Sequence, residues 1–170
     1  PVGAVADDSD DNSKQSHLKS WSNIIPNAKK RFVVLADFNN EAVLDRETGL
    51  VWELGPITPK FRWDVSLLQC ISKSVGGRKG WRLPFIPELT SLIDPSVNLL
   101  GGPGPALPLG HPFLNVPTSE GAQTFWSANS IPWDTIRPTI QFSWSVDFRD
   151  GGISAGSTIG SASLDRVWCV

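Results

Sequence analysis

The stretch that decides the fold is RWDVSLLQCISKSVGGRKGWRLPFIPELTSLID, residues 62–94. Its first half places Trp63, Leu67, Ile71 and Val75 four residues apart, which predicts a helix with one apolar stripe. Two glycines follow the stripe, in a position where helices commonly end. We therefore expect one amphipathic helix over most of the first half.

The second half of this stretch predicts a shorter helix. Pro87 is tolerated in the first turn of a helix, because the N–H that proline lacks has no partner there. Leu89, Leu92 and Ile93 have the spacing of an inward face. The Asp-Pro pair that follows favours the end of the helix there.

The segment WRLP between the two helices is expected to be structural. Trp81 and Leu83 are large and apolar, and we expect both in the core. Arg82 is expected to pair with a carboxylate such as Glu88 or Asp94.

Working outward, short β-rich runs lie on both sides of the two helices. Gly49 lies between two of them and favours a hairpin turn. The segment 95–117, between the second predicted helix and the predicted strand at 124–130, is rich in Pro and Gly. We therefore expect it to be irregular, and such long loops are often functional. The predicted strands are RFVVL (31–35), AVLD (42–45), GLVWE (49–53), TFWSANS (124–130), QFSWSVDFRD (141–150) and RVWCV (166–170).

The strand at 141–150 alternates apolar and polar residues, which predicts two different faces. We expect the apolar face to pack on the core. The polar face is either solvated surface or part of a ligand-binding site. The apolar residues are Phe142, Trp144, Val146 and Phe148, and the polar ones are Ser143, Ser145, Asp147 and Arg149.

Composition excludes several classes of protein. The 170 residues carry 15 Lys and Arg against 17 Asp and Glu, a net charge of −2, so we expect no nucleic-acid partner. No apolar run reaches the roughly 18 residues of a membrane span. The chain begins at Pro1 and lacks Met, which suggests the mature form of a longer, secreted precursor. Its two cysteines could form one disulfide or remain two free thiols.

Residues 1–28 are expected to form a polar arm or linker, and residues 29–170 the folded domain. The arm has no hydrophobic periodicity and carries an acidic run at Asp7, Asp8, Asp10 and Asp11. Such a segment is loosely ordered unless a partner holds it. We expect any oligomer or larger assembly to form through this arm.

The sequence lacks the patterns of known catalytic and metal sites. It has neither a Cys/His cluster suited to zinc nor a glycine-rich phosphate loop. His17 and His111 are expected at the surface. We therefore expect a non-catalytic protein with no metal and no cofactor.

Several motifs together resemble the Lcl C-terminal domain family, named for a bacterial collagen-like adhesin. The resemblance covers about residues 31–170. The string G-W-R-L-P followed by E-L-x-S-L-I-D is the most specific part. The ordered motifs are AVLDRETGLVWE (42–53), GGRKGWRLPFIPELTSLID (76–94), LPLGHPF (107–113), FWSA (125–128), SWSVDFRDG (143–151) and DRVWCV (165–170).

The resemblance implies a C-type-lectin-like α+β fold, with two helices packed on a twisted antiparallel sheet and long irregular loops. It implies a disulfide between Cys70 on the first helix and Cys169 on the last strand. It also implies a secreted or surface-exposed, or else periplasmic, bacterial protein that acts in adhesion and binds a glycan or protein ligand, sometimes as a homo-oligomer. The motifs of calcium-dependent sugar sites are absent, and sulfated glycans would require a local basic cluster.

The resemblance places the candidate ligand-binding residues on and beside the strand at 141–150. The alternative function is a structural subunit of an extracellular filament, sheath or surface layer. An enzyme ranks third, because the formylglycine-generating enzyme has a related fold but depends on reactive cysteines. The candidate ligand-binding residues are Ser145, Asp147, Arg149, Asp150, Trp133 and Arg137.

Overall fold

The computed structural model describes residues 24–97, 104–118, 123–131, 142–158 and 163–170. Within them the chain is α+β, with two β-sheets and few helices, as predicted at the level of fold class. Two candidate ligand-binding residues, Trp133 and Arg137, lie outside the described residues, as does His17.

The elements are short and follow most of the predicted runs. The helices are α1 (Ala28–Arg31), α2 (Trp63–Ser72) and α3 (Ile86–Ser91), with single 3-10 turns η1 (Ala36–Phe38) and η2 (Pro95–Val97). The strands are β1 (Phe32–Val34), β2 (Ala42–Asp45), β3 (Val51–Glu53), β4 (Ile57–Phe61), β5 (Thr124–Ser130), β6 (Phe142–Asp147), β7 (Ile153–Ser157) and β8 (Asp165–Val167).

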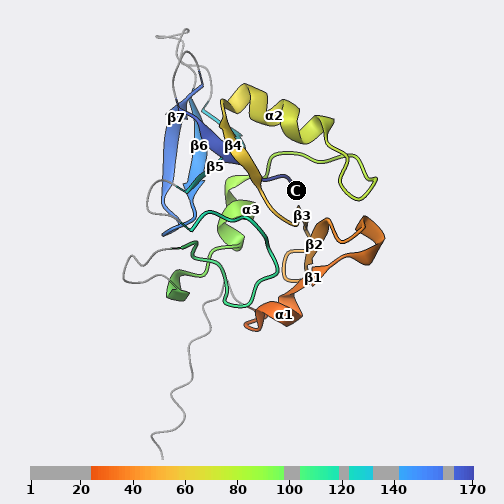
Figure 1. Ribbon diagram of the computed structural model, residues 1–170. Coiled ribbons are helices and arrows are strands. Elements are labelled where there is room, and N and C mark those ends of the chain that lie inside the picture. The colour runs from red at the N-terminus through yellow and green to blue at the C-terminus, as the bar shows by residue number, and fades with distance from the viewer. Residues whose placement is uncertain (1–23, 98–103, 119–122, 132–141, 159–162) are drawn as a thin grey trace, which may run out of the picture.

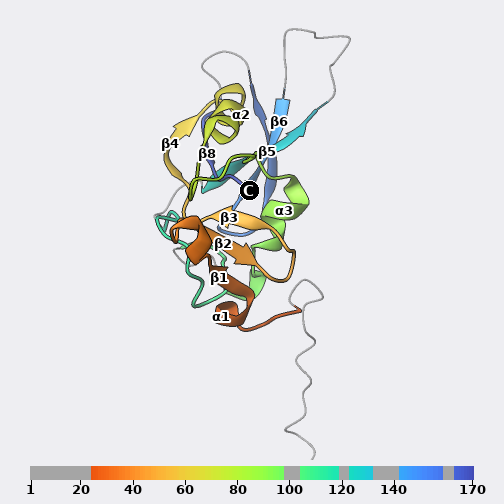
Figure 2. The same cartoon turned by 90° about the vertical axis from the view of Figure 1, so that its right-hand side faces the viewer.

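The strands of the described residues form two sheets. The first sheet has the order β1-β2-β3 and is antiparallel, and it contains the predicted hairpin. The second has the order β4-β8-β5-β6-β7, and its β5–β8 pair is parallel. In Figures 1 and 2 the smaller sheet and α1 lie below the larger sheet.

Both faces of the five-stranded sheet are covered, and each has its own core. Phe125 and Trp126 are neighbours on β5, so their side chains point to opposite faces. Phe125 joins the core that contains Leu89 of α3 and Leu92, the residue after it. Trp126 joins the core that contains Cys70 of α2. The two predicted helices therefore pack on opposite faces of one sheet.

The disulfide implied by the resemblance is present. Cys70 of α2 is bonded to Cys169, with their Cα atoms 5.6 Å apart, and both residues are fully buried. Glu53 of β3 accepts a hydrogen bond from the Cys169 N–H on Oε2 at 3.0 Å, and its own carbonyl accepts one from Trp168 Nε1 at 3.0 Å. The C-terminal segment is thus attached both to α2 and to the smaller sheet.

The first predicted helix is shorter than its apolar pattern. Helix α2 ends at Ser72, and Ile71 is 65 % exposed, so the expectation that Ile71 lies in the apolar stripe is wrong. Val75 is buried, but it lies in a separate tight turn, where it pairs with Arg78. The apolar spacing of four residues therefore extends past the end of α2 to Val75, although Val75 does not belong to the helix.

The expected division of β6 into an apolar buried face and a polar open face is correct only in part. Val146 and Phe148 are fully buried, as predicted, whereas Phe142 is 37 % exposed and Trp144 is half-buried. The expectation for the polar face is wrong at Ser143 and Ser145, because both are buried. The cause is Trp126, whose indole extends across β6 far enough to lie where a side chain on Gly156 of β7 would be. Only small side chains fit beneath that indole, and serine is small enough.

This arrangement changes the expected effects of substitutions on β6. Phe148→Ala should lower the free energy of unfolding by about 3 to 5 kcal/mol, because the ring is fully buried beside Phe125 and Trp168. Trp144→Ala should cost clearly less, since part of its indole is exposed. Urea denaturation of both variants checks this order. Equal losses would show that Trp144 is as deeply packed as Phe148.

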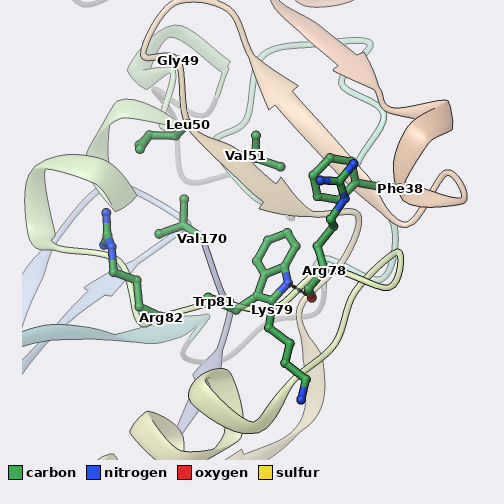
Figure 3. Close-up of a pocket in the computed structure, with 10 residues that line it drawn as sticks. Phe38, Gly49, Leu50, Val51, Arg78, Lys79, Trp81, Arg82 and Val170 are labelled. Carbon is green, nitrogen blue, oxygen red and sulfur yellow. Dashed lines mark hydrogen bonds between the residues drawn. The ribbon is translucent and has the colours of Figure 1, made fainter.

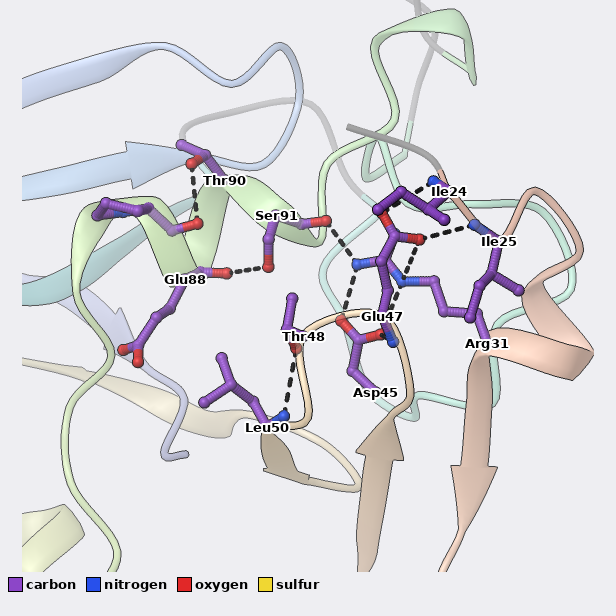
Figure 4. A network of polar contacts seen from close by, with 11 residues as sticks. Ile24, Ile25, Arg31, Asp45, Glu47, Thr48, Leu50, Glu88, Thr90 and Ser91 are labelled. Carbon is purple, nitrogen blue, oxygen red and sulfur yellow. Dashed lines mark hydrogen bonds and ion pairs between the residues drawn. The ribbon is translucent and has the colours of Figure 1, made fainter. Parts of the chain in front are cut away.

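A buried ion pair joins the start of the domain to its centre (Figure 4). Arg31 of α1 donates from Nε and Nη2 to the two carboxylate oxygens of Asp45, at 2.8 and 2.7 Å. Arg31 also donates to the carbonyl of Ser91 at the end of α3 at 2.7 Å. The N–H groups of Ile24 and Ile25 each donate to the Glu47 carboxylate at 3.1 Å. Among the described residues, Ile24 and Ile25 therefore already contact the domain, and the predicted boundary at 28/29 stays a prediction.

Candidate functional site

A pocket of about 360 Å³ opens between the smaller sheet, the loop after α2 and the segment before α3 (Figure 3). Its lining combines two aromatic rings, three cationic side chains and several small or apolar residues. The lining residues are Phe38, Gly49, Leu50, Val51, Arg78, Lys79, Gly80, Trp81, Arg82 and Val170.

The loop that carries two of these cations is held by a tight turn. Gly76 and Gly77 have φ values of +57° and +73°, and the flanking residues Val75 and Arg78 pair as in a two-residue hairpin. A side chain on Gly76 would collide with the backbone of Phe38, at 2.4 Å from its Cα. The glycine therefore allows this loop to lie directly against η1.

The two aromatic residues that line the pocket, Phe38 and Trp81, contact each other. The rings of Phe38 and Trp81 meet edge to face, with 6.3 Å between their centroids. Trp81 Nε1 donates to the carbonyl of Arg78 at 2.9 Å, which ties the indole to the loop. Trp81 is buried, as predicted, although its edge contributes to the pocket lining.

The guanidinium of Arg78 lies 5.2 Å from the centroid of the Phe38 ring, a cation–π contact. Lys79 extends its side chain away from that ring (Figure 3). Both residues are exposed, and within the described residues no carboxylate forms an ion pair with either of them. Their positive charges therefore remain available to a ligand.

The third cation, Arg82, is already paired. Its two terminal nitrogens donate to the Glu88 carboxylate at 2.7 and 2.6 Å, which confirms one of the two predicted partners. These hydrogen bonds lower the pKa of Glu88 although burial opposes the shift, and a bond from the Phe85 N–H adds to the lowering. Arg82 thus serves to join the WRLP segment to α3.

The candidate ligand-binding residues predicted on and beside β6 lie in three different environments. Ser145 is buried and its hydroxyl contacts Ser154 at 3.1 Å, so it cannot meet a ligand in this arrangement. Asp150 is exposed and accepts the Gly152 N–H at 2.7 Å, which shapes the turn into β7. Asp147 and Arg149 lie at the same turn and contact each other.

Asp147 and Arg149 form a closed pair. Arg149 donates from Nη2 and Nε to Asp147 Oδ2 at 2.8 and 3.1 Å, and its backbone N–H donates to Oδ1 at 3.0 Å. Burial alone would raise the pKa of Asp147, but the hydrogen bonds from Arg149 outweigh it and the pKa falls. A ligand anion would have to displace this carboxylate, so the predicted site is less available than Arg78 and Lys79.

His111 is half-buried rather than a surface residue, contrary to the prediction. It lies beside the Phe113 ring and lines a second, mostly apolar pocket of about 540 Å³ with Leu107 and Leu109. Burial lowers the pKa of His111, because the charged imidazolium loses solvent. In the described residues no group of three or more His, Cys, Asp or Glu side chains could hold a metal ion.

The prediction of ligand-binding residues did not include Phe38, Arg78 and Lys79. The signal available for the two cations was the string GGRKG at residues 76–80, where two basic residues lie between glycines. Glycine at positive φ produces sharp turns that expose the residues next to them. No such signal marked Phe38, because it approaches the loop only through tertiary packing.

The family model of the Lcl C-terminal domain matches residues 41–170. Neither the curated proteins nor the solved structures produced a match. No helix among the described residues has the length and apolar character needed to cross a membrane.

Proposed function

Because the chain belongs to the Lcl C-terminal domain family, which is adhesin-associated, we propose that it is an extracellular, non-catalytic binding module with a lectin-like mode of action. The ligand is an acidic glycan, and the site is the pocket around Trp81. The observation that carries the proposal is the pairing of two unneutralised cations, Arg78 and Lys79, with the rings of Phe38 and Trp81. This pairing supplies the local basic cluster that an acidic glycan requires.

The chemistry of the pocket suits a charged sugar. A guanidinium binds a carboxylate or sulfate through two parallel hydrogen bonds, and a lysine adds a mobile point charge. The apolar face of a sugar ring packs on aromatic surface, which Phe38 and Trp81 provide. A volume of about 360 Å³ falls at the small end of ordinary ligand sites.

The C-type-lectin-like fold belongs to the same proposal. It is supported by two helices on opposite faces of one sheet and by a disulfide from α2 to the segment after β8. Long irregular connections also fit, since residues 104–118 contain no helix or strand. In this proposal the pocket replaces the calcium-dependent sugar site as the ligand-binding surface.

One observation favours the alternative, a structural subunit of an extracellular assembly. Leu68 and Ile71, one turn apart on α2, are each 65 % exposed. Apolar side chains on one helix face are typical of a contact with another protein. The two functions make different demands, because assembly through α2 would not require Arg78 or Lys79.

Binding of a heparin hexasaccharide, measured by isothermal titration calorimetry in 50 mM NaCl, tests the proposed site. The variant Arg78→Gln/Lys79→Gln should bind at least tenfold more weakly, because each charge-assisted hydrogen bond contributes about 1.5 to 3 kcal/mol. Both side chains are exposed, so the melting temperature should change little.

The matched control is Arg149→Gln/Asp147→Asn, which removes the closed pair of the originally predicted site. It should leave the affinity within about twofold of the unmodified chain. Loss of binding in this control with retention in Arg78→Gln/Lys79→Gln would transfer the site to the β6–β7 turn. A neutral dextran of similar length shows whether the acidic groups are needed.

A further inference from the structure

We infer that the edge strand β7 pairs in antiparallel fashion with β7 of a second copy of this chain, so that the larger sheet continues across a two-fold axis. The inference goes beyond the proposed function, since none of the residues that line the pocket lies on β7. Strand β7 is the last in the order β4-β8-β5-β6-β7 and lies at the outer edge of the larger sheet (Figure 1). One side of it pairs with β6, and no described strand pairs with the other.

The register with β6 shows which backbone groups of β7 point outward. The Asp147 N–H donates to the Gly152 carbonyl at 2.8 Å, so these two residues form a hydrogen-bonded pair. In an antiparallel ladder such pairs alternate with pairs that do not hydrogen-bond. Ile153 and Ala155 therefore lie in pairs of the second kind, and their N–H and C=O groups point away from β6. Within the described residues no hydrogen bond engages these outward groups.

These two outward residues fit one antiparallel register of a second copy. When Ile153 is opposite Ala155 of the second copy, each such pair exchanges two hydrogen bonds. The two-fold axis then passes between the two Ser154 residues, and both copies use the same surface. The next outward residue, Ser157, already takes part in another interaction, so it is left out of this register.

The same register covers the apolar side chains of this edge. Ala155 is opposite Trp144 of β6, so Trp144, Ala155 and Ile153 of the second copy lie in one row on one face of the sheet. Ile153 is 50 % exposed, and Trp144 is half-buried. The small Ala155 between them leaves room for the isoleucine to pack against the indole. Each copy thus covers the exposed isoleucine of the other.

The charges of the chain allow this contact. Residues 151–164 include no charged side chain. The closest charge along the chain, Asp150, is four residues from the two-fold axis, so the two Asp150 carboxylates would lie about 27 Å apart. This distance exceeds the screening length of about 8 Å at physiological ionic strength. An uncharged strand suits a copy of itself, whereas a charged peptide would find no opposite charge on it.

The other sheet edges that the structure describes are protected against such pairing. Strand β4 contains Pro59, which lacks an N–H, and the exposed Lys60, and its register with β8 is shifted. Proline, lysine and such irregularities hinder pairing between edges. Strand β1 has only three residues, and the N–H of its first residue already donates to α1. In β3 the N–H of Glu53 donates to the Cys169 carbonyl at 3.1 Å. Strand β7 has neither proline nor charge, and its register with β6 is regular.

Analytical ultracentrifugation of the full chain tests this contact. No glycan is present, so the outcome does not depend on the proposed function. The chain should be a monomer of 18.5 kDa at about 5 μM. Its weight-average mass should increase at least 1.5-fold by about 1 mM, because so small an interface gives a weak dimer. A monomer at both concentrations would overturn the inference.

Ala155→Lys should abolish this increase, because it places a charge in the middle of the contact. Ala155 is exposed, so the melting temperature should change little. Ala155→Pro removes the outward N–H and should have the same effect on the mass. The matched control Thr58→Lys adds the same charge to an exposed position of β4 and should dimerise like the unmodified chain. A dimer that persists in both Ala155 variants, or that is lost in Leu68→Ser/Ile71→Ser, would form through another surface and contradict the inference.

Engineered cysteines test the register. Residues opposite each other in a pair that is not hydrogen-bonded have Cα atoms about 4.5 Å apart, which a disulfide can span. Ser154→Cys should therefore join two copies, as oxidised glutathione takes up the two electrons and two protons and becomes two thiols. Ile153→Cys and Ala155→Cys are the controls, and each should give at least fivefold less linked dimer, because neither residue is opposite itself. More linked dimer from either control than from Ser154→Cys would refute the proposed pairing.

Discussion

Removal of the Cys70–Cys169 disulfide is expected to lower the free energy of unfolding by about 4 to 5 kcal/mol. The two cysteines are 99 residues apart in sequence, so the bond closes a loop that includes most of the domain. An open unfolded chain gains the conformational freedom that this loop removes. Since the bond also joins α2 to the segment after β8, its loss should loosen one whole face of the larger sheet.

Urea denaturation of Cys70→Ala/Cys169→Ala, compared with the oxidised chain, measures this effect. Reduction of the unmodified chain provides a second route to the same state and should give a similar midpoint. The control is Ser72→Ala, at the exposed end of α2, which should change stability by no more than about 0.5 kcal/mol. A loss below about 1 kcal/mol would show that packing alone holds Cys70 against β8.

Arg31→Met is expected to cost about 3 to 5 kcal/mol, because it leaves the carboxylate of Asp45 buried without its partner. Both side chains of this pair are almost wholly inaccessible, at 2 % and 0 % exposed. The change also removes the hydrogen bond to the Ser91 carbonyl, which connects α1 to the end of α3.

A double variant distinguishes lost attraction from an uncompensated charge. Arg31→Met/Asp45→Leu replaces the ion pair by apolar side chains, and it should recover much of the stability lost in Arg31→Met. The partly exposed pair Arg82–Glu88 is the comparison, since Arg82→Met should cost only about 1 kcal/mol. Thermal melts of the unmodified chain and of these three variants give their order of stability. A double variant no more stable than Arg31→Met would mean that the charge on Asp45 is not the cause.

Local patterns in the sequence determined which segments form most elements. Pro87 and the spacing of Leu89, Leu92 and Ile93 predicted α3, and all three apolar residues are buried. The residues around Gly49 predicted the β2–β3 hairpin, in which Gly49 has a φ of +76°. These predictions succeed because turn geometry and helical periodicity depend on residues within a few positions of one another.

Two strands were not predicted, since their composition is unusual for a sheet. β4 contains Pro59, which is tolerated at the edge of a sheet, and β4 is an edge strand. β7 consists mostly of small residues, and Gly156 lies in it because the Trp126 indole occupies the space of a side chain. In both cases the neighbouring strand, not local propensity, makes the segment extended.

The sequence by itself determined the family motifs, the disulfide partners by resemblance, the two helices and the hairpin. Only the tertiary structure decided that Ser143 and Ser145 are covered by Trp126 and that Phe38 meets Arg78 and Trp81. Alternation along a strand shows that its two faces differ, but not what covers each face. A pocket built from residues far apart in the chain depends on packing between elements, which no local period records.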